Sequence, residues 1–387
     1  MSRGRSIISW QPVLTDHMAY TLLEFARVAN ADLQAFVATR EDADRKAQGW
    51  TATDLKGLDV AVLPQRGWLK FVIRVLQSRP GALHIIVSPF GDGRIAVVLL
   101  LALLNRCAVY LVSEPYSPVA AGYFDDRHRW LNSLKARLRP LLYRLYGALI
   151  SRRLKGVFAI SPLAVRQYME LGIDRQRVFP FGYFVPARAA VSEPHRPASS
   201  DTRNSLRLVF VGNLIRRKGV DNLAAAVREL AQEGIPVTLD VYGPGDVAML
   251  GEASSAVRYR GRIPFGETGR AISEYDVLVL TSLHDGWGVV VNEAIQAGVP
   301  VACTVQVGAS ALVGHRGCGW VFDNPSVVSI KTVIRALSAN RASVAAARKA
   351  AVAAASTLSP EIAGRFMYDA VRSAEEGTAP PPCPWYA

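Results

Sequence analysis

Short apolar runs alternate with longer amphipathic stretches along most of this 387-residue chain. Apolar runs rich in β-branched residues are typical of buried strands, whereas apolar residues spaced three and four apart are typical of helices. Their alternation predicts parallel sheets with helices on both faces. In the first half of the chain the expected strands are Ser6–Ser9, Leu33–Ala38, Ala82–Ser88, Ala108–Val112 and Gly156–Ile160, with helices at Met18–Ala29 and Arg94–Leu104.

The alternation stops between residues 187 and 205, where the chain is rich in Ser, Pro and charge and carries no apolar period. Such a segment is typical of a linker. We therefore predict an α/β fold of two doubly wound domains, residues 1–186 and 206–358, followed by a helix and irregular tail over 359–387 that returns to the first domain. The strands expected in the second domain are Leu206–Val211, Val237–Tyr242, Val257–Tyr259, Val277–Thr281 and Val299–Cys303.

The chain is strongly basic, with 45 Lys and Arg against 32 Asp and Glu and a net charge of +13. Such a charge favours anionic partners without choosing among nucleic acid, acidic lipid and phosphorylated small molecules. The four cysteines show no metal-binding spacing, which favours free thiols in a reducing compartment. The most apolar run, Ile95 to Leu104, is about half the length of a membrane span and favours a buried helix in a cytosolic protein.

The loop after the first strand of the second domain carries three consecutive cations, Arg216, Arg217 and Lys218. Gly212 permits a turn at the end of the strand, and an amphipathic helix follows Gly219. A loop between the carboxyl end of a parallel strand and a helix N-terminus favours anions, because backbone N–H groups and the helix dipole point toward it. Two interpretations stay open from these residues alone: a diphosphate site and a solvated basic loop.

A second segment, from Asp285 to Glu293, also joins a strand to a helix. Gly286 and Gly288 allow the backbone to approach a ligand closely, and Trp287 lies between them. Asp285 in the loop and Glu293 one turn into the helix both belong to the edge of the sheet where open α/β folds bind ligands. Carboxylates suit sugar hydroxyls because each accepts several hydrogen bonds. The alternative makes Asp285 a helix cap and Glu293 a surface residue.

Together these two segments resemble the retaining glycosyltransferases of family 4, which have the GT-B fold. The family pattern of a strand, a G-R-L-x-x-x-K-G-like loop and a later E-x-F-G-x-x-x-x-E-A-x-A-x-G-x-P-V motif appears here in two places. They are Gly212-Asn213-Leu214-Ile215-Arg216-Arg217-Lys218-Gly219 and Asp285-Gly286-Trp287-Gly288 through Glu293-Ala294 to Gly298-Val299-Pro300-Val301. The resemblance covers most of the chain and is strong from about Leu206 to Val301.

The resemblance implies that Lys218, with a nearby Arg, holds the diphosphate of a nucleotide-sugar donor. It also implies that Glu293 binds the ribose, that Asp285 contacts the transferred sugar, and that the backbone of 286–288 lies along sugar and phosphate. The chain departs from the family twice. Asp285 replaces a Glu, and Asn213 stands where many members have Arg, so that Arg216 or Arg217 must supply the second cation.

The first domain offers two weaker candidates. Glu114 follows the strand ending at Ser113, where family members often have a cleft His, so it is either a cleft carboxylate or ordinary polarity at a strand end. His17 lies in the first loop, Trp10 to His17, and either faces the acceptor or serves a structural role.

Asp42-Ala43-Asp44 matches the Asp-x-Asp of metal-dependent transferases, but no strand leads into it, and we expect no metal or other cofactor.

Residues 127–155 form a basic belt in which nine Lys and Arg alternate with aromatic and aliphatic residues. We expect a helical segment broken at Pro140. Its composition suits an anionic membrane surface, and a helix pair with a solvated basic face is the alternative. Because the chain has no recognised nucleic-acid motif, we expect no nucleic-acid partner.

The resemblance thus implies a hexosyltransferase that moves sugar from a nucleoside-diphosphate sugar to a saccharide or lipid-linked saccharide in surface polysaccharide or glycolipid assembly. If the basic belt docks on lipid, the enzyme is peripheral on the inner face of the cell membrane. Two alternatives stay open: a nucleotide-sugar epimerase, and a degenerate transferase that serves as a binding or assembly partner.

Overall fold

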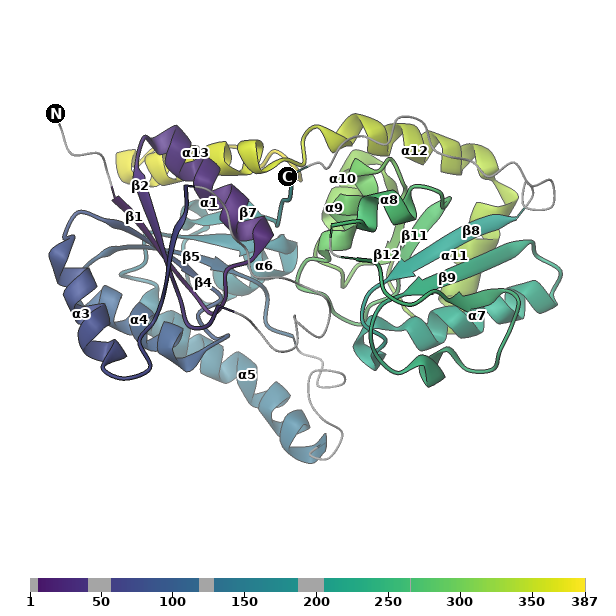
Figure 1. Ribbon diagram of the computed structural model, residues 1–387, viewed down its shortest axis with the longest axis horizontal. Coiled ribbons are helices and arrows are strands. Elements are labelled where there is room, and N and C mark those ends of the chain that lie inside the picture. Colours follow the sequence, from purple (N-terminus) through teal and green to yellow (C-terminus); the bar gives the residue numbers. More distant parts are fainter. Residues whose placement is uncertain (1–5, 41–56, 118–128, 187–204, 265, 387) are drawn as a thin grey trace.

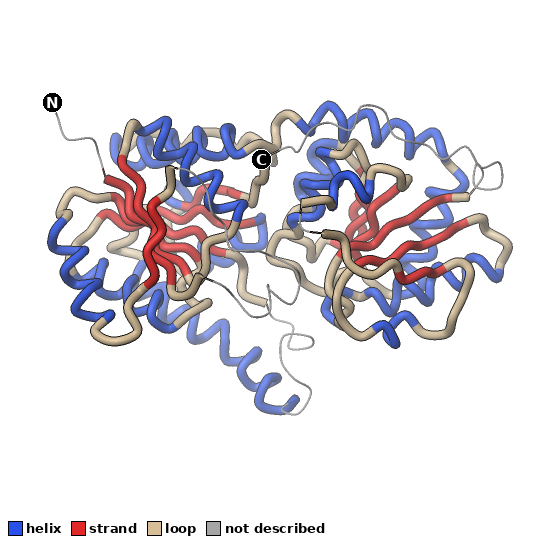
Figure 2. Tube along the Cα trace, in the orientation of Figure 1, coloured by secondary structure: helices blue, strands red, loops and turns tan. Residues whose placement is uncertain are grey.

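The computed structural model describes residues 6–40, 57–117, 129–186, 205–264 and 266–386. These residues form two parallel sheets, each covered by helices, which lie beside one another along the long axis of the molecule (Figures 1 and 2). The first sheet has the strand order β3-β2-β1-β4-β5-β6-β7 and the second the order β10-β9-β8-β11-β12-β13. The predicted α/β fold with two doubly wound sheets is confirmed.

The first sheet contains every strand expected for it and two that the sequence did not indicate, β3 and β7. Pro180 lies within β7, which pairs only with β6 at the sheet edge, where a missing N–H is tolerated. The strands are β1 Ser6–Gln11, β2 Asp32–Val37, β3 Asp59–Val62, β4 Leu83–Val87, β5 Ala108–Ser113, β6 Gly156–Ile160 and β7 Val178–Phe181. The helices are α1 Asp16–Ala29, α3 Trp68–Ser78, α4 Gly93–Leu104, α5 Arg129–Ile150 and α6 Ser161–Glu170, with a 3-10 turn at Arg175–Arg177.

The second sheet begins at the predicted residue and follows the predicted strands closely, with β13 added at its edge. Its strands are β8 Leu206–Val211, β9 Val237–Tyr242, β10 Val257–Tyr259, β11 Val277–Leu280, β12 Val301–Thr304 and β13 Gly319–Phe322. The helices are α7 Val220–Gln232, α8 Thr268–Ile272, α9 Val289–Gln296, α10 Ser310–Arg316, α11 Val327–Ala339, α12 Arg341–Ala355 and α13 Pro360–Glu376. Two 3-10 turns occur at Arg216–Lys218 and Val247–Leu250.

Helix α13 crosses back to the first sheet and lies against α1 (Figure 1). The two helices approach so closely that a Cβ on Gly364 would lie 2.6 Å from both the Glu24 Cβ and the Phe25 backbone nitrogen. One hydrophobic core consequently runs from the first sheet into the second and includes Trp385 and Tyr386, the last residues described. The two sheets are therefore joined by packing as well as by the chain.

Helix α5 differs from the expected broken segment, because it runs as one 22-residue helix with Pro140 inside it. Pro140 is exposed, so the ring that would disturb a packed helix lies at the solvent side. Arg127, at the start of the predicted belt, and the Asp42-Ala43-Asp44 triplet lie outside the described residues.

The four cysteines are unpaired, and three of them are buried, which confirms the expected free thiols. Helix α4 places Ile95, Val98 and Leu99 in the core, as its apolar sequence indicated. Within the described ranges, no helix has the length and hydropathy that crossing a bilayer requires.

Candidate active site

Two loops at the carboxyl edge of the second sheet bring the predicted donor residues together. The loop after β8 carries Lys218, and the loop after β11 carries Asp285; the Lys218 Nζ donates to an Asp285 carboxylate oxygen. Both side chains are largely buried, at 16% and 13% exposure. The Arg217 guanidinium donates to the His284 carbonyl at 2.7 Å, so it fastens the same two loops. Two cations and one carboxylate therefore converge at adjacent strand ends.

Gly219 explains how the two loops lie so close. It has a φ of 64° and caps the N-terminus of α7, and a Cβ there would lie 2.2 Å from the Thr281 carbonyl oxygen. In return, the Thr281 hydroxyl donates to the Gly219 carbonyl at 2.8 Å. A side chain at 219 would force the loops apart, so glycine here fixes Lys218 next to the end of β11.

The electrostatics of the pair follow from its position. Burial alone would raise the pKa of Asp285, but the charge and hydrogen bond of Lys218, with the charge of Arg217, hold it below its ordinary value. The pKa of the neighbouring His284 imidazole is also lowered, to about 4, because burial disfavours its charged form. At neutral pH the cluster therefore carries an ionised Asp285 and a neutral His284.

The remaining predicted residues of these loops differ in exposure. Arg216 is exposed, whereas Asn213 and Gly212 are partly buried. Of the two arginines proposed as the second cation, Arg217 is the one held against the Asp285 loop, and Arg216 extends from the 3-10 turn into solvent. The backbone of Asn213 is used within its own loop, since its carbonyl accepts from Ile215 at 3.0 Å.

Close backbone approaches continue along the same edge of the sheet. A Cβ on Gly243, which follows β9, would lie 1.9 Å from the Gly212 carbonyl oxygen at the end of β8. The Gly243 N–H donates to the Gly261 carbonyl beyond β10 at 2.8 Å. The ends of β8 and β9 are thus each followed by a glycine, and that of β10 by Arg260 and then Gly261, so backbone lies close to backbone along this edge.

Glu293 lies in α9, whose N-cap is Gly288 with a φ of 89°. The helix presents Glu293, which is partly buried, while its Val291, Asn292, Ala294 and Ile295 are buried. Helix α9 follows the loop that contains Asp285, so both predicted carboxylates stand at one strand-to-helix connection. The free N–H groups of the first turn of α9 belong to the same place.

Trp287 was predicted to meet the substrate through the backbone of residues 286–288, and its side chain lies elsewhere. Its indole is 1% exposed, and its Nε1 donates to the Asn292 Oδ1 at 2.8 Å. A Cβ on Gly182 would lie 2.5 Å from the indole ring, so the ring covers the segment that follows β7. The side chain packs between the two sheets because its large apolar surface is worth more buried than facing a polar ligand. Its backbone alone remains beside the loop.

Glu114 reaches the donor loops from the first sheet. It follows β5, and its carboxylate lies against the backbone of Gly286: a Cβ on that glycine would be 2.3 Å from the Glu114 Oε2. Gly308 also lies close to Gly286, since a Cβ on Gly308 would lie 2.1 Å from the Gly286 carbonyl oxygen. The structure therefore brings Glu114 and the Asp285 loop together across the junction of the two sheets.

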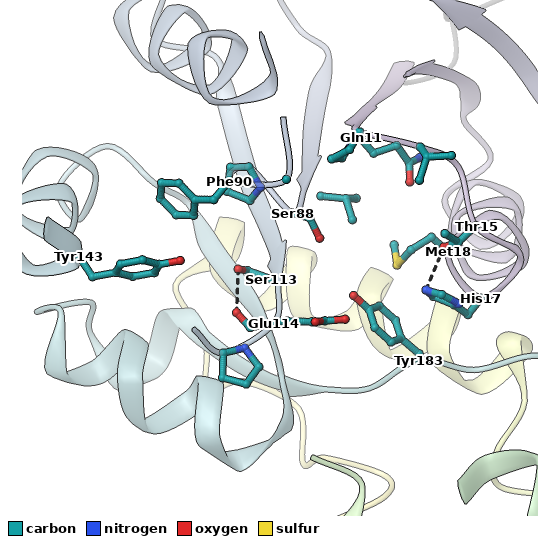
Figure 3. Close-up of a pocket in the computed structure, with 16 residues that line it drawn as sticks. Gln11, Thr15, His17, Met18, Ser88, Phe90, Ser113, Glu114, Tyr143 and Tyr183 are labelled. Atoms are coloured by element: carbon teal, nitrogen blue, oxygen red, sulfur yellow. Dashed lines mark hydrogen bonds between the residues drawn. The ribbon is translucent and has the colours of Figure 1, made fainter. Parts of the chain in front are cut away.

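A cavity of about 350 Å³ opens beside Glu114 at the carboxyl ends of β1, β4 and β5 (Figure 3). His17 belongs to its lining, together with the hydroxyls of Ser88, Ser113 and Tyr183. The His17 ring is buried, shares a 2.9 Å hydrogen bond with Thr15 and lies 4.0 Å from the Tyr183 ring centre. The lining also includes Gln11, Pro12, Val13, Thr15, Met18, Val87, Pro89, Phe90, Gly91, Glu114, Pro115 and Tyr143.

Several residues at the junction could not be found from the sequence. Asn292 donates to the Tyr183 carbonyl at 3.0 Å, and Gln296 donates to the Val185 carbonyl at 2.9 Å. Both lie on the face of α9 that meets the end of the first domain. Their only signal was a pair of amides four residues apart on a helix otherwise rich in apolar residues, which does not indicate a partner.

Residues 205–340 match the family model described as glycosyl transferases group 1. The amylovoran biosynthesis glycosyltransferase AmsK of Erwinia amylovora is 26% identical over 188 residues, 45% of this chain and 44% of that protein. The putative teichuronic acid biosynthesis glycosyltransferase TuaC of Bacillus subtilis is 34% identical over 113 residues, 28% of this chain and 27% of that protein. The chain thus spans less than half the length of these curated relatives.

Solved structures agree with the whole described fold. Anabaena HepE, crystallised with UDP and glucose, has a TM-score of 0.66 at 16% identity, covering 95% of this chain and 100% of that one. WaaG, a glycosyltransferase involved in lipopolysaccharide biosynthesis, has a TM-score of 0.61 at 15% identity, covering 95% and 99%. At this identity the likeness shows the fold, which is GT-B. Residues 205–340, which contain the second sheet and its loops, therefore match the glycosyl transferases group 1 family model within a chain of GT-B fold.

Proposed function

We propose that this protein is a retaining glycosyltransferase that moves a hexose from a nucleoside-diphosphate sugar to a saccharide or lipid-linked saccharide acceptor. The observation that carries the proposal is the contact between Lys218 and Asp285, with Arg217 fastening the same loops and Glu293 on the following helix. Cations for a diphosphate and carboxylates for sugar hydroxyls lie at one sheet edge, in the part of the chain that matches a glycosyltransferase family.

The chemistry fits this set of residues. A nucleoside diphosphate is a stable leaving group, so the protein has to neutralise developing phosphate charge rather than supply a strong acid. Lys218, Arg217 and the N-terminus of α7 can do so without a metal, and we propose a reaction without one. Retention by front-side displacement requires the acceptor hydroxyl on the same face as the departing diphosphate, and orientation contributes much of the rate.

Glu114 would serve the acceptor side of this reaction. Its carboxylate stands between the Gly286 backbone and the cavity at the ends of β1, β4 and β5. A hydroxyl bound in that cavity could donate to Glu114 while it faces the donor sugar. The wall of aromatic rings and hydroxyls, including Phe90, Tyr143 and Ser113, is suited to a sugar, which offers an apolar face and polar edges.

Helix α5 supports a lipid-linked acceptor. Tyr143 lines the cavity and the C-terminal end of the helix packs on the first domain through Ile150, while the opposite end extends away from the first sheet (Figure 1). A stripe of exposed apolar residues follows the helical period, and exposed arginines flank it. The apolar residues are Trp130, Leu134, Leu138, Leu141, Leu142, Leu145 and Leu149, and the arginines are Arg137, Arg144, Arg152 and Arg153. An apolar stripe with flanking cations is the pattern of a helix that lies in an anionic membrane surface.

We therefore propose that α5 seats the enzyme on the inner face of the cell membrane, with the cavity facing a lipid-linked saccharide. Vesicle flotation tests this. The protein should float with vesicles containing anionic phospholipid and not with neutral ones, and Leu141→Ser/Leu145→Ser should abolish flotation. Arg137→Glu/Arg144→Glu should abolish it as well. Flotation that is equal on neutral vesicles, or unchanged in both variants, would contradict the membrane proposal and leave the transferase proposal intact.

The donor site is tested by calorimetry with UDP, GDP and ADP on the full chain. UDP comes first, because HepE was crystallised with it. Lys218→Ala should weaken binding by removing a direct cation, roughly tenfold or more for a lost charge-assisted hydrogen bond. Glu293→Ala should weaken it by losing ribose contacts. If no nucleotide binds at millimolar concentration, the transferase proposal fails and an assembly-partner role becomes the better explanation.

The type of reaction is tested by NMR on the products. With the preferred nucleotide sugar and a panel of saccharides, transfer should give a glycoside with the same anomeric configuration as the donor. An inverted product would refute the proposed mechanism while keeping the transferase. Epimerised nucleotide sugar that forms without acceptor would instead identify an epimerase.

A further inference from the structure

The segment that follows α13 ends in two buried aromatic residues, Trp385 and Tyr386, at the junction of the two sheets. Toward the first sheet, the Tyr386 hydroxyl donates to the Phe181 carbonyl, the last residue of β7, at 2.6 Å. The Trp385 ring stacks on Phe184 with ring centres 4.1 Å apart. A segment predicted to be an irregular tail is indeed coil, but it is anchored to the end of the first domain.

The same segment is also held by the second domain, through Trp385 and Pro384. The Trp385 Nε1 donates to the Thr357 carbonyl, beyond α12, at 2.9 Å. One residue earlier, the Pro384 carbonyl accepts from the Arg316 guanidinium at the end of α10. The segment therefore spans both sheets through directional hydrogen bonds, which apolar burial alone would not require.

The Tyr386 ring continues into the candidate active site through Trp287. Their ring centres are 6.2 Å apart, and the Trp287 indole also lies against Gly182, where a Cβ would be 2.5 Å away. Trp287 is the residue next to Gly286, whose backbone meets the Glu114 carboxylate. A shift of the indole would therefore move the backbone that faces Glu114.

Ser161, the residue after β6, is held at the same junction of the two domains. Ser161 has a φ of 83°, which a residue with a side chain rarely adopts, and it is fully buried. A Cβ on Gly308 of the second domain would lie 2.8 Å from the Ser161 Cβ. Such a conformation persists only where the surroundings determine it from several sides, and here both domains and Tyr386 surround it.

We propose that Trp385 and Tyr386 are positioning residues: through Trp287 they hold the Asp285–Gly288 loop in register with Glu114, and so set the geometry between the donor loops and the acceptor cavity. The inference rests on the proposed function for its catalytic consequence. Its structural content, the register of Gly286 and Glu114, can be measured separately.

Disulfide trapping measures the position of residue 286 relative to residue 114, and it does not depend on enzyme activity. A Cβ at 286 would lie 3.1 Å from the Glu114 Cγ, the position that a cysteine sulfur at 114 takes, so Glu114→Cys/Gly286→Cys should cross-link readily. The background carries Cys383→Ser, because the other three cysteines are buried. Cross-link formation under mild oxidation is followed by peptide mass spectrometry.

With Trp385 and Tyr386 intact, the pair should cross-link. Adding Tyr386→Phe, which keeps the ring and removes the hydroxyl, should slow cross-linking by about threefold or more, and adding Trp385→Ala should slow it further. Unchanged rates in both variants, or a parent pair that fails to cross-link, would overturn the proposal. Circular dichroism and thermal melting identify a variant that has lost its fold. Tyr386→Phe keeps the packing of the ring, so this variant should stay folded.

Kinetics give the second readout, on the chain with its native cysteines. Tyr386→Phe and Gly182→Ala should lower kcat while leaving the Kd for UDP unchanged, because Lys218 and Glu293, the proposed nucleotide contacts, lie wholly within the second domain. A purely structural role would lower the melting temperature without this split, and that result would overturn the proposal. If the unaltered protein binds no nucleotide and turns over no donor, the proposed function fails, whereas the cross-linking result still decides the register.

Discussion

Replacing Asp285 by Asn should tighten the binding of a nucleoside diphosphate, although it should abolish transfer. In the structure Asp285 is the partner of Lys218, the residue proposed to hold the diphosphate. A diphosphate that reaches Lys218 therefore approaches an ionised carboxylate, whose pKa is held below its ordinary value by Lys218 and Arg217 although burial opposes this. Asn keeps the shape of the side chain and removes the repulsion.

The magnitude follows from Coulomb's law. Because the Lys218 and Asp285 side chains touch, a phosphate charge on Lys218 would lie about 5 Å from the carboxylate. At that distance one pair of unit charges interacts by roughly 1 kcal/mol at a dielectric constant of about 80 and roughly 3 kcal/mol at about 20. Asp285→Asn should therefore lower the Kd for UDP by about 5-fold to 150-fold.

Calorimetry with UDP measures the effect, at low and at high salt. Asp369→Asn is the matched control, because it makes the same chemical change in an exposed i,i+4 ion pair on α13. It should leave the Kd unchanged. If Asp285→Asn instead weakens UDP binding as strongly as Lys218→Ala does, Asp285 orients Lys218 for the ligand rather than competing with it, and the reasoning is refuted.

Two further predictions concern stability. The His84 ring accepts a hydrogen bond from the Trp10 Nε1 at 3.0 Å, and burial lowers its pKa from 6.5 to about 4. As the pH falls, His84 therefore takes up a proton more readily in the unfolded chain than in the folded one. The free energy of unfolding is at its full value above about pH 6.5 and is lower by about 2 kcal/mol at about pH 5. Urea unfolding at about pH 7.5 and about pH 5 should show this decrease. His84→Gln can still accept the hydrogen bond but does not titrate, so its free energy of unfolding should decrease by about 2 kcal/mol less than that of the unaltered protein. Equal decreases in the two proteins would contradict the prediction. Gly219→Ala should destabilise the second domain by about 3 kcal/mol, because its Cβ would lie 2.2 Å from the Thr281 carbonyl oxygen in addition to the left-handed backbone. Gly234→Ala, at a φ of 79° with no atom within 4 Å of its Cβ, should cost only about 1 kcal/mol, and urea midpoints that place the two variants together would show that the close approach does not matter.

The class of fold could be predicted from the sequence, because periodicity is a local property. Strands Leu206–Val211, Val237–Tyr242 and Val257–Tyr259 have the predicted limits, since each is a buried run between turn residues. The two loops that follow strand ends were also visible, because Gly, cations and carboxylates at those points are unusual. Strand β7 was not predicted: it contains Pro180, which a strand tolerates at a sheet edge, and edge position is not evident from the local pattern.

Side-chain contacts across the junction were decided only by the tertiary structure. The sequence placed Glu114 at a strand end, but its contact with Gly286 depends on how two sheets face each other. It placed Trp287 in the ligand loop, although the large apolar ring is buried against Gly182 between the sheets. It gave no reason for Trp385 and Tyr386 to be more than an irregular tail.

What the sequence determined by itself was therefore the set of elements and the chemistry at each strand end. Spacing along the chain controls these, and the forces involved act within one or two turns. Which strand ends meet across the molecule was determined only by folding, because those contacts join residues more than a hundred positions apart. Their geometry is fixed by packing of the whole core, as in the contact of Glu114 with Gly286 and that of Tyr386 with Phe181.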